Sequence, residues 1–408
     1  MDRRTLGVVF ATFLGQGLAI GGTVGAFSLF VRPLTEAFDA SNLQVSVGIS
    51  LITLTLAMCG VPVGNWLDRG SPRKVMFTGC AIISTAVLLA SQATSLGMLA
   101  LLCVMTGVGI PMLGPLTTAA VVGKTAEAGR GRALGIANLG VPVGGMLFSL
   151  LAGFTLDAWD WRTTLQCFGA AFLAIGLPAV WFGIPADLAS KSTAVDESDA
   201  SRSATEAPAQ DDEEWTPKRL IASIEFRLIA LVMGVGFGTT AGFAAHIAPY
   251  LVDLGATTRL AGTLVGAMQG LMLLGTLGLG ALADRRPAAQ ILIGILAVQL
   301  VAFGVMSAGF GLVPGASMLM LSGIASGGLL PVLGQLLAQR FGAASLGRSM
   351  GLGNLMMLPF GFGLPMVGGA LRDATGSYAS LFMVCMGLFA IGLTALIALQ
   401  RRPRAAVR

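Results

Sequence analysis

The sequence carries very little charge. Only 11% of its 408 residues are Asp, Glu, Lys or Arg, whereas 55% are hydrophobic, and the mean hydropathy is +0.82. A typical soluble domain has about a quarter of its residues charged. A soluble core of this length does not need so much apolar surface. The composition therefore excludes an ordinary soluble fold and indicates a protein that lies in a lipid bilayer.

Histidine and cysteine are also scarce. The chain has one histidine, His246, and five cysteines that all lie inside apolar segments without the spacing of a metal site (Cys59, Cys80, Cys103, Cys167 and Cys385). We expect these cysteines to be small buried hydrophobic side chains. A catalytic triad or a zinc site lacks the residues that it would need. We therefore expect no enzyme, and no cofactor or metal.

The chain contains an internal repeat instead. Residues 22–157 are echoed by residues 238–373 at a constant offset of 216. The matched segments include Gly64-x-x-x-Asp68-Arg69 with Gly280-x-x-x-Asp284-Arg285, residues 131–139 with 347–355, Pro115 with Pro331, and Gly153 and Asp157 with Gly369 and Asp373. A register that holds without slippage over this length indicates two copies of one structural unit.

Each copy consists of apolar segments. Crossing a hydrocarbon core of about 30 Å takes roughly 20 apolar residues in a helix. Twelve stretches meet this requirement: 6–31, 43–66, 75–93, 96–122, 133–156, 163–184, 227–250, 260–282, 288–308, 313–339, 349–371 and 379–400. The sequence thus predicts an all-α membrane protein of two pseudo-symmetric six-helix bundles, residues 1–185 and 227–408. The first stretch resembles a signal peptide, but its repeat partner is the seventh helix, so we expect it to be an integral helix.

The basic residues indicate the orientation. If the loops alternate from an inside N-terminus, 21 of the 25 Lys and Arg lie on one side, and Arg32, Arg162, Arg259 and Arg372 lie opposite. The positive-inside rule then predicts cytoplasmic termini in the cell's inner (plasma) membrane. The excess of basic residues is explained by topology and does not indicate nucleic acid as a partner. Residues 186–226 are rich in Ser, Thr, Ala and acids, which predicts a disordered cytoplasmic linker.

One motif carries a resemblance to a known family. Gly64-Asn-Trp-Leu-Asp68-Arg69-Gly70-Ser-Pro-Arg73-Lys74 resembles the loop 2–3 signature of the major facilitator superfamily, and Gly280–Arg286 is a degenerate second copy. Together with twelve helices and a duplicated half, this resemblance covers essentially the whole chain. It implies a monomeric secondary transporter that moves a small organic solute by alternating access, with helices 1, 4, 7 and 10 lining the cavity.

Two further segments resemble one branch of that family. The exit of helix 1, Phe27–Phe38, and the exit of helix 7, His246–Gly255, are similar to the monocarboxylate and oxalate–formate porters. The resemblance implies uptake or exchange of a small organic anion coupled to protons. That branch carries a carboxylate-binding arginine four residues before the signature glycine of helix 8, a place that Thr276 occupies here. A carboxylate would have to be held by other donors. Efflux of a hydrophobic or drug-like compound remains an alternative, and a non-transporting membrane sensor is a remote one.

The signature predicts a conformational latch. An anion at the end of helix 2 can face the positive amino end of a neighbouring helix. We expect Asp68 to meet the start of helix 11 and Asp284 the start of helix 5, which would close the cytoplasmic side. The residues assigned to this latch are Gly64, Asp68, Arg69, Arg73, Arg132, Gly280, Asp284, Arg285 and Arg348. The alternative is that these charges only fix the topology of the loops.

His246 is the one strongly polar ionisable side chain expected within the bilayer. Such a group is costly there and indicates function, and its pKa range suits proton coupling. The alternative is a neutral histidine bonded to backbone that Pro249 opens. Other polar side chains could line a cavity, although each hydroxyl can also bond its own helix: Thr23, Ser28, Thr117, Thr118, Asn138, Thr239, Thr240, Gln269, Thr276, Gln335 and Asn354.

Proline and glycine predict how the helices bend and pack. Pro115 and Pro331 occupy equivalent positions in helices 4 and 10 and are interpreted as symmetric kinks or hinges, or as inherited packing bends. Gly140 and Gly144 in helix 5, and Gly266 and Gly270 in helix 8, place small residues four apart. We expect these two pairs to pack across the two halves.

Overall fold

The structure is a computed structural model that describes residues 2–125, 129–188, 215–342 and 345–401. Twelve of its helices are long and apolar enough to cross a membrane, as predicted. They are Arg3–Gly25, Asn42–Arg69, Pro72–Ala90, Leu96–Thr125, Arg130–Ala158, Trp161–Gly183, Ile224–Ala244, Thr258–Ala283, Ala288–Ser307, Leu312–Phe341, Leu346–Thr375 and Ala379–Gln400. The predicted all-α membrane fold is confirmed.

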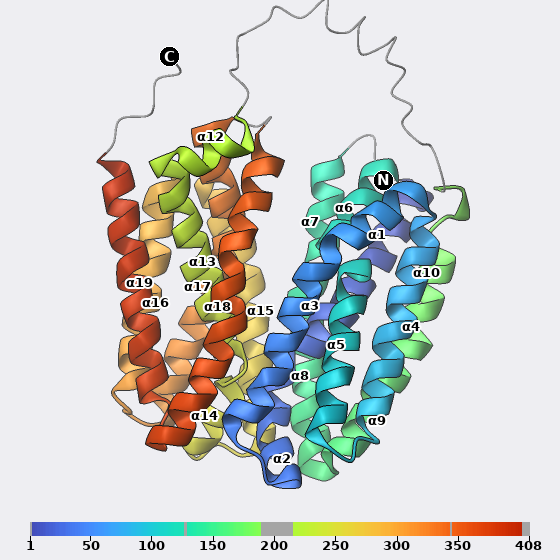
Figure 1. Cartoon of the computed structure of the whole chain (residues 1–408), viewed down its shortest axis with the longest axis vertical. Helices are drawn as coiled ribbons and strands as arrows, with labels where there is room; N and C mark the ends of the chain where they lie inside the picture. Colours follow the sequence, from blue (N-terminus) through green and yellow to red (C-terminus); the bar gives the residue numbers. More distant parts are fainter. Residues whose placement is uncertain (1, 126–128, 189–214, 343–344, 402–408) are drawn as a thin grey trace, which may run out of the picture.

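The helices form two groups that follow the sequence (Figure 1). The first half comprises α1 (Arg3–Gln16), η1 (Gly17–Gly25), α2 (Phe27–Phe38), α3 (Asn42–Arg69), α4 (Pro72–Ala90), α5 (Leu96–Leu113), α6 (Pro115–Thr125), α7 (Arg130–Asn138), α8 (Gly140–Ala158), α9 (Trp161–Ala171), η2 (Phe172–Gly176), α10 (Leu177–Gly183) and η3 (Ala186–Leu188). The second half comprises α12 (Pro217–Ala222), α13 (Ile224–Ala244), α14 (Ile247–Asp253), α15 (Thr258–Ala283), α16 (Ala288–Ser307), α17 (Leu312–Phe341), α18 (Leu346–Thr375) and α19 (Ala379–Gln400).

The two ends of the molecule are named here by the chain ends. The terminal side is the side on which α1 begins and α19 ends, at the top of Figure 1. The distal side is the opposite end, where α2 ends and α3 begins. The four basic residues expected opposite the others lie in α2 and at the distal ends of α9, α15 and α18. The charge asymmetry on which the orientation was predicted is therefore present in the fold.

The expected linker is described only at its edges, because residues 189–214 lie outside the described part of the chain. At its far edge the structure differs from the predicted disorder. Thr216 caps α12 by accepting a hydrogen bond from the Arg219 amide, and Ser223 caps α13 in the same way through Phe226. These caps satisfy amides that a helix start leaves free, so helical structure begins at Pro217.

Interruptions of the membrane helices are concentrated in the first half. Helix 1 contains the π-helix η1 after α1, and helix 6 contains the short π-helix η2 after α9. Helix 4 breaks at Gly114 between α5 and α6, and helix 5 breaks at Leu139 between α7 and α8. Among the described spans of the second half, helix 7 breaks at Ala245 and His246, whereas α15 to α19 are each continuous. Such π segments are uncommon and occur frequently at functional sites. The two halves share a fold but differ in regularity.

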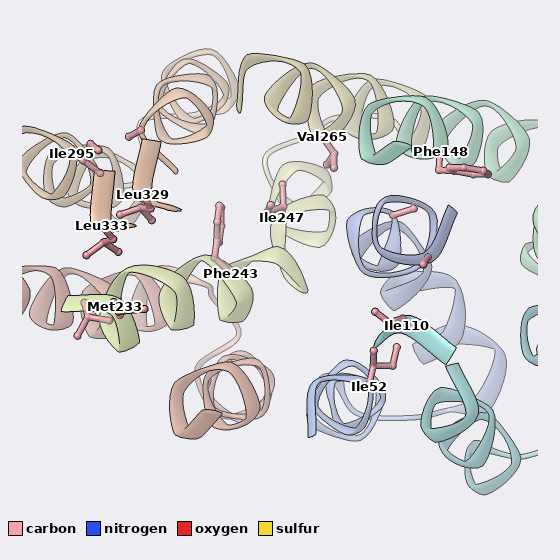
Figure 2. Packing of buried hydrophobic residues seen from close by; sticks show 14 of the residues in the cluster. Ile52, Ile110, Phe148, Met233, Phe243, Ile247, Val265, Ile295, Leu329 and Leu333 are labelled. Atoms are coloured by element: carbon pink, nitrogen blue, oxygen red, sulfur yellow. The ribbon is translucent and has the colours of Figure 1, made fainter. Parts of the chain in front are cut away.

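Each half has its own aromatic core. Phe148, Phe168 and Phe172 contact one another in the first half, and Phe243, Phe303 and Phe382 do so in the second. Figure 2 shows how aliphatic residues fill the rest, with Ile52 and Ile110 side by side on α3 and α5 and Leu329 near Leu333 on α17. Of the cysteines, Cys80 and Cys385 are buried, Cys59 and Cys103 are half-buried, and Cys167 is exposed, so burial was wrongly predicted for the last.

Candidate functional site between the two halves

The halves meet mainly along two seams, α8 against α15 and α3 against α18, and α2 also contacts α14 and α15. On the first seam, a methyl group at Gly153 would lie 2.8 Å from the Cα of Gly262. On the second, Ser50 Oγ donates to the Phe362 carbonyl at 2.7 Å. Toward the terminal side, added methyl groups at the Gly64 and Gly278 positions would meet nothing within 4 Å. The halves converge on the distal side and diverge toward the terminal side (Figure 1).

The predicted packing of the small-residue pairs was half right. Gly266 and Gly270 do face the other half. A methyl group at Gly266 would lie 2.9 Å from the Met146 carbonyl oxygen, and one at Gly270 would lie 3.0 Å from the Met146 Sδ. Gly140 and Gly144 do not. They face the backbone of α1 and η1 in their own half, at Phe13 and Gly17. Small residues four apart predict close packing, but the spacing does not say which helix approaches.

Gln269 occupies the middle of the first seam. Its side chain extends from α15 against the first half, where methyl groups at Gly145 and Gly25 would lie 2.5 and 2.9 Å from its Nε2. The two glycines thus make room for this amide. No hydrogen bond to Gln269 is formed by the described residues. An amide offers both a donor and an acceptor, so Gln269 can bind a polar solute in either role.

Gln16 was missed by the sequence reasoning. It is fully buried at the end of α1, and its Nε2 donates to Asn138 Oδ1 at 3.0 Å and to the Ala137 carbonyl at 3.3 Å. Its Oε1 has no partner among the described residues. Asn138 itself is exposed next to the break between α7 and α8. An uncharged amide inside an apolar span was the available signal, because burying one is costly unless it is hydrogen-bonded.

Two threonines satisfy carbonyls that prolines leave free. Proline has no N–H for the carbonyl four residues earlier. Pro115 frees the Pro111 carbonyl, to which Thr117 Oγ1 donates at 2.8 Å. Pro331 frees the Gly327 carbonyl, to which Thr276 Oγ1 donates at 3.0 Å from the neighbouring α15. Both prolines of the predicted hinge pair thus free a carbonyl that a threonine bonds, and their role as hinges stays a prediction. Of these two helices, however, only helix 4 is interrupted, just before Pro115, because α17 is continuous through Pro331.

The remaining candidate side chains divide by partner. The hydroxyls of Thr23, Thr239 and Thr240 donate to carbonyls of their own helices, which favours the structural interpretation of each. Ser28 and Thr118 are buried without a hydrogen-bond partner among the described residues. Asn354 is exposed on α18, and Gln335 Nε2 donates to Asp284 Oδ1 at 3.4 Å near the terminal side. Of the predicted polar set, Gln269 is placed against the opposite half, and Ser28 lines a cavity that residues of both halves enclose.

His246 lies at the break between α13 and α14 and is fully buried. Its Nε2 lies 2.9 Å from the Pro365 carbonyl oxygen, which requires Nε2 to carry the proton and donate. Nδ1 has no partner among the described residues, nor has the hydroxyl of Tyr378, whose ring centroid is 5.4 Å from that of His246. Gly368 leaves room for the imidazole. These contacts all lie within the second half, and two of them, at Pro365 and Gly368, are with the seam helix α18.

Among the described residues, the latch carboxylates Asp68 and Asp284 do not reach the helix starts that were predicted as their partners in this conformation. Asp68 is exposed, and no hydrogen bond or ion pair joins it to α18 among the described residues. Arg73 instead stacks over Trp181 of α10 at 3.9 Å from the ring centroid. Arg348 donates to the Trp215 carbonyl at 2.8 Å. Because the terminal side is the side where the halves diverge, an open latch is the expected arrangement here, and its closure stays a prediction.

Among the described residues, no group of three His, Cys, Asp or Glu could hold a metal ion. Away from the distal ends of the seam helices, the available chemistry is hydrogen bonding by neutral amides, hydroxyls and open carbonyls. The segments that form the first seam and helix 1, namely 6–31, 133–156 and 260–283, contain no charged residue. The site can therefore bind and release a solute, and it offers no nucleophile or acid–base pair for covalent catalysis.

Comparison with known proteins gives a family for this arrangement. Residues 9–364 match the sequence profile of the Major Facilitator Superfamily. An uncharacterized MFS-type transporter of Bacillus subtilis, YcxA, is 27% identical over 160 residues, which are 39% of each chain. Human monocarboxylate transporter 6 is 29% identical over 167 residues, 41% of this chain and 33% of the relative. The chain thus spans about a third to two fifths of the length of the curated relatives that it matches.

The fold comparison covers nearly the whole chain. The crystal structure of a bacterial homolog to the human lysosomal transporter Spinster, in an inward-facing and occupied conformation, superposes with a TM-score of 0.78 at 15% identity, over 99% of this chain and 98% of the other. A likeness at this identity shows the fold alone. The profile match and the twelve-span fold agree, and the protein is a multi-pass membrane transporter rather than an enzyme. The chain belongs to the major facilitator superfamily.

Proposed function

We propose that this transporter carries a small organic acid together with a proton, by alternating access between its two halves. The observation that carries the proposal is the placement of Gln269 against Gly25 and Gly145, within the seam segments 133–156 and 260–283 that contain no charged residue. An unpaired carboxylate would be costly in such surroundings. A carboxylic acid that has taken up a proton is neutral, and it can donate to and accept from one amide at the same time.

The partial relatives support the same class of solute. Besides human monocarboxylate transporter 6, monocarboxylate transporter 13 of the rat is 30% identical over 168 residues, 41% of this chain. Thr276 stands where the branch has its arginine, and its hydroxyl is already bonded to the Gly327 carbonyl. Binding of the protonated acid removes the need for that arginine. This is why proton coupling and a charge-free seam belong together in the proposal.

We propose that the proton passes through His246 on its way to the acid, and that the charge of His246 acts on α18 while the proton is there. One stretch of α18 contacts both His246 and the first half. Its Phe362 carbonyl accepts a hydrogen bond from Ser50 across the second seam, and its Pro365 carbonyl accepts one from His246. Charging Nδ1 would therefore change how α18 sits between the imidazole and the first half. The ring of Tyr378 faces His246, Arg372 stacks over Tyr378 and pairs with Asp253 at 2.9 Å, and the nearby charge that acts on His246 is that of Asp373. Burial raises the pKa of Asp253, which suits a proton-accepting group near the distal surface.

The orientation completes the proposal. We assign the terminal side to the cytoplasm because 21 of the 25 Lys and Arg were predicted there, and the membrane to the inner (plasma) membrane of the cell. The conformation would then be open toward the cytoplasm. The two bundles would be residues 1–185 and 227–408, working as a monomer, with residues 186–226 as a tether.

Flux into proteoliposomes tests the function. Small monocarboxylates and their primary amides should be offered with and without an imposed inward proton gradient. We expect accumulation of an acid that depends on the gradient, and a KM that rises about tenfold in Gln269→Leu because one or two hydrogen bonds are lost. Gln339→Leu, at an exposed position of α17, is the matched control. Gradient-independent movement of every acid would refute proton coupling, and no flux of any compound would favour a sensor.

Export of a hydrophobic compound is the second candidate. The observation that favours it is an apolar cavity of about 90 Å³ beside η1, lined by residues that include Phe27, Phe30 and Leu34. Hydrophobic dyes offered to the same vesicles separate the two candidates. Movement of dyes without movement of acids would replace the first proposal by this one.

A further inference from the structure

A carboxylate crosses between the halves on the distal side. Asp373, in the last turn of α18, accepts hydrogen bonds through Oδ1 from the Asn42 amide at 3.0 Å and from Asn42 Nδ2 at 2.8 Å. Its Oδ2 accepts from the Leu43 amide at 2.9 Å. Asn42 and Leu43 are the first two residues of α3. A single aspartate of the second half thus supplies three hydrogen bonds to one helix start of the first half.

The start of α3 needs this partner. The first amides of a helix have no acceptor within the helix, and the amino end carries partial positive charge. Ser41 satisfies only the Gln44 amide, at 3.2 Å. The two amides before it are satisfied by Asp373. One turn earlier in α18, a methyl group at Gly369 would lie 2.7 Å from the Cα and the amide nitrogen of Leu43, so glycine is what allows the approach.

The internal repeat provides a natural comparison. Asp157 is the repeat partner of Asp373, and it stands in the last turn of α8 where that helix meets α15. Among the described residues, the Asp157 carboxylate accepts no hydrogen bond from the start of α15, which Thr257 caps through the Leu260 amide at 3.2 Å. Asp157 instead lines a cavity of about 760 Å³ together with Thr257 and Thr258. The two equivalent carboxylates are therefore used differently, one bonded across the halves and one not.

We propose that Asp373, Asn42 and Leu43 form a distal clamp that holds the distal side of the transporter closed and is broken whenever that side opens. The proposal rests on alternating access and needs no particular solute. In the distal-closed state the clamp supplies three charge-assisted hydrogen bonds, which opening must replace by water. Asp157 contributes nothing comparable, so removing its charge leaves the equilibrium between the two states unchanged.

Hydrogen exchange on the full-length protein in detergent tests the distal clamp without any transport assay. In Asp373→Asn the amides of residues 42 and 43 will exchange faster for purely local reasons. The deciding readout is therefore the other seam, residues 258–264 of α15, which Asp373 does not touch. There we expect exchange to become about tenfold faster, because a larger share of molecules opens the distal side. Peptides on the terminal side of α3 and α18 should become slower to exchange.

Asp157→Asn is the matched control. It should leave all of these exchange rates within about twofold of those of the unmodified protein. Gly369→Ala is a second route to the same state, because its methyl group pushes α18 away from Leu43. Unchanged peptides in α16 and α19 show that each variant is folded. Unchanged exchange at residues 258–264 in Asp373→Asn, or an equal rise in Asp157→Asn, would overturn the proposal. Neither result bears on which solute is carried.

Discussion

Replacing Gly145 by alanine should weaken binding of the solute without lowering the thermal stability of the protein. The new methyl group would lie 2.5 Å from Nε2, 2.9 Å from Cδ and 3.3 Å from Cγ of Gln269. All three are atoms of a flexible side chain, which can rotate away without moving the backbone. We therefore expect Gly145→Ala to displace the Gln269 amide from the seam and to leave the two halves where they are.

The expected magnitudes differ in sign for the two properties. Alanine is favoured over glycine in a helix interior by up to about 1 kcal/mol, so the Tm should stay the same or rise slightly. A displaced amide loses one or two hydrogen bonds to the solute, each worth about 1 kcal/mol net and more where a buried partner is left unpaired. That loss corresponds to a rise in KM of about tenfold to a hundredfold.

Gly144→Ala is the control for this experiment. Its methyl group would overlap the backbone of Gly17, and a backbone cannot rotate away. Overpacking of this kind costs about 1–3 kcal/mol, so this variant should lower the Tm. Proteoliposome flux gives KM, and thermal unfolding in detergent gives the Tm. An unchanged KM in Gly145→Ala would show that Gln269 does not bind the solute. A Tm as low as that of Gly144→Ala would show that the Gln269 side chain cannot rotate away from the new methyl group.

Three further outcomes follow from the contacts. His246→Ala and His246→Gln should both abolish accumulation driven by a proton gradient while downhill exchange persists in part, since neither side chain titrates; full gradient-driven uptake by either variant would exclude His246 as the coupling group. Asp68→Asn should expose terminal-side positions to cysteine reagents more often, because the open latch would no longer close; unchanged accessibility would leave Asp68 as a topology charge. Thr276→Val should cost about 1–3 kcal/mol in thermal unfolding, because the Gly327 carbonyl is left unpaired, whereas Thr263→Val at an exposed site should not.

The sequence predicted the architecture well because its strongest signals are long. Twelve apolar segments and a repeat in constant register predict twelve spans in two copies, whereas the break of helix 7 at Ala245 and His246 lies inside the predicted stretch 227–250. Single contacts between helices were less predictable. The spacing of Gly140 and Gly144 indicates that a backbone comes close, but α1 and α15 are both apolar and equally good partners on that evidence. Only the three-dimensional arrangement distinguishes them.

The candidate site shows the same limit. Every threonine in an apolar span looks polar in sequence, yet Thr117 and Thr276 donate to carbonyls that prolines free. Recognising this needs the position of a proline on a neighbouring helix, which sequence does not provide for Thr276. Gln16 gives a weaker signal, because nothing in the sequence places Asn138 beside it. Gln269 was found because an amide in the middle of an otherwise apolar helix has few structural uses.

The hydroxyl of Thr276 bridges two helices, whereas that of Thr117 closes a gap in its own segment. The bridge fastens α15 to α17, so the second half should turn as a stiff block when the halves exchange positions. The first half contains η1, the break at Gly114 and the break at Leu139, each a place where a helix can bend with little loss of hydrogen bonding. The two halves would therefore contribute unequally to alternating access. The second half would move as a rigid body, and the first half would bend to accommodate that motion.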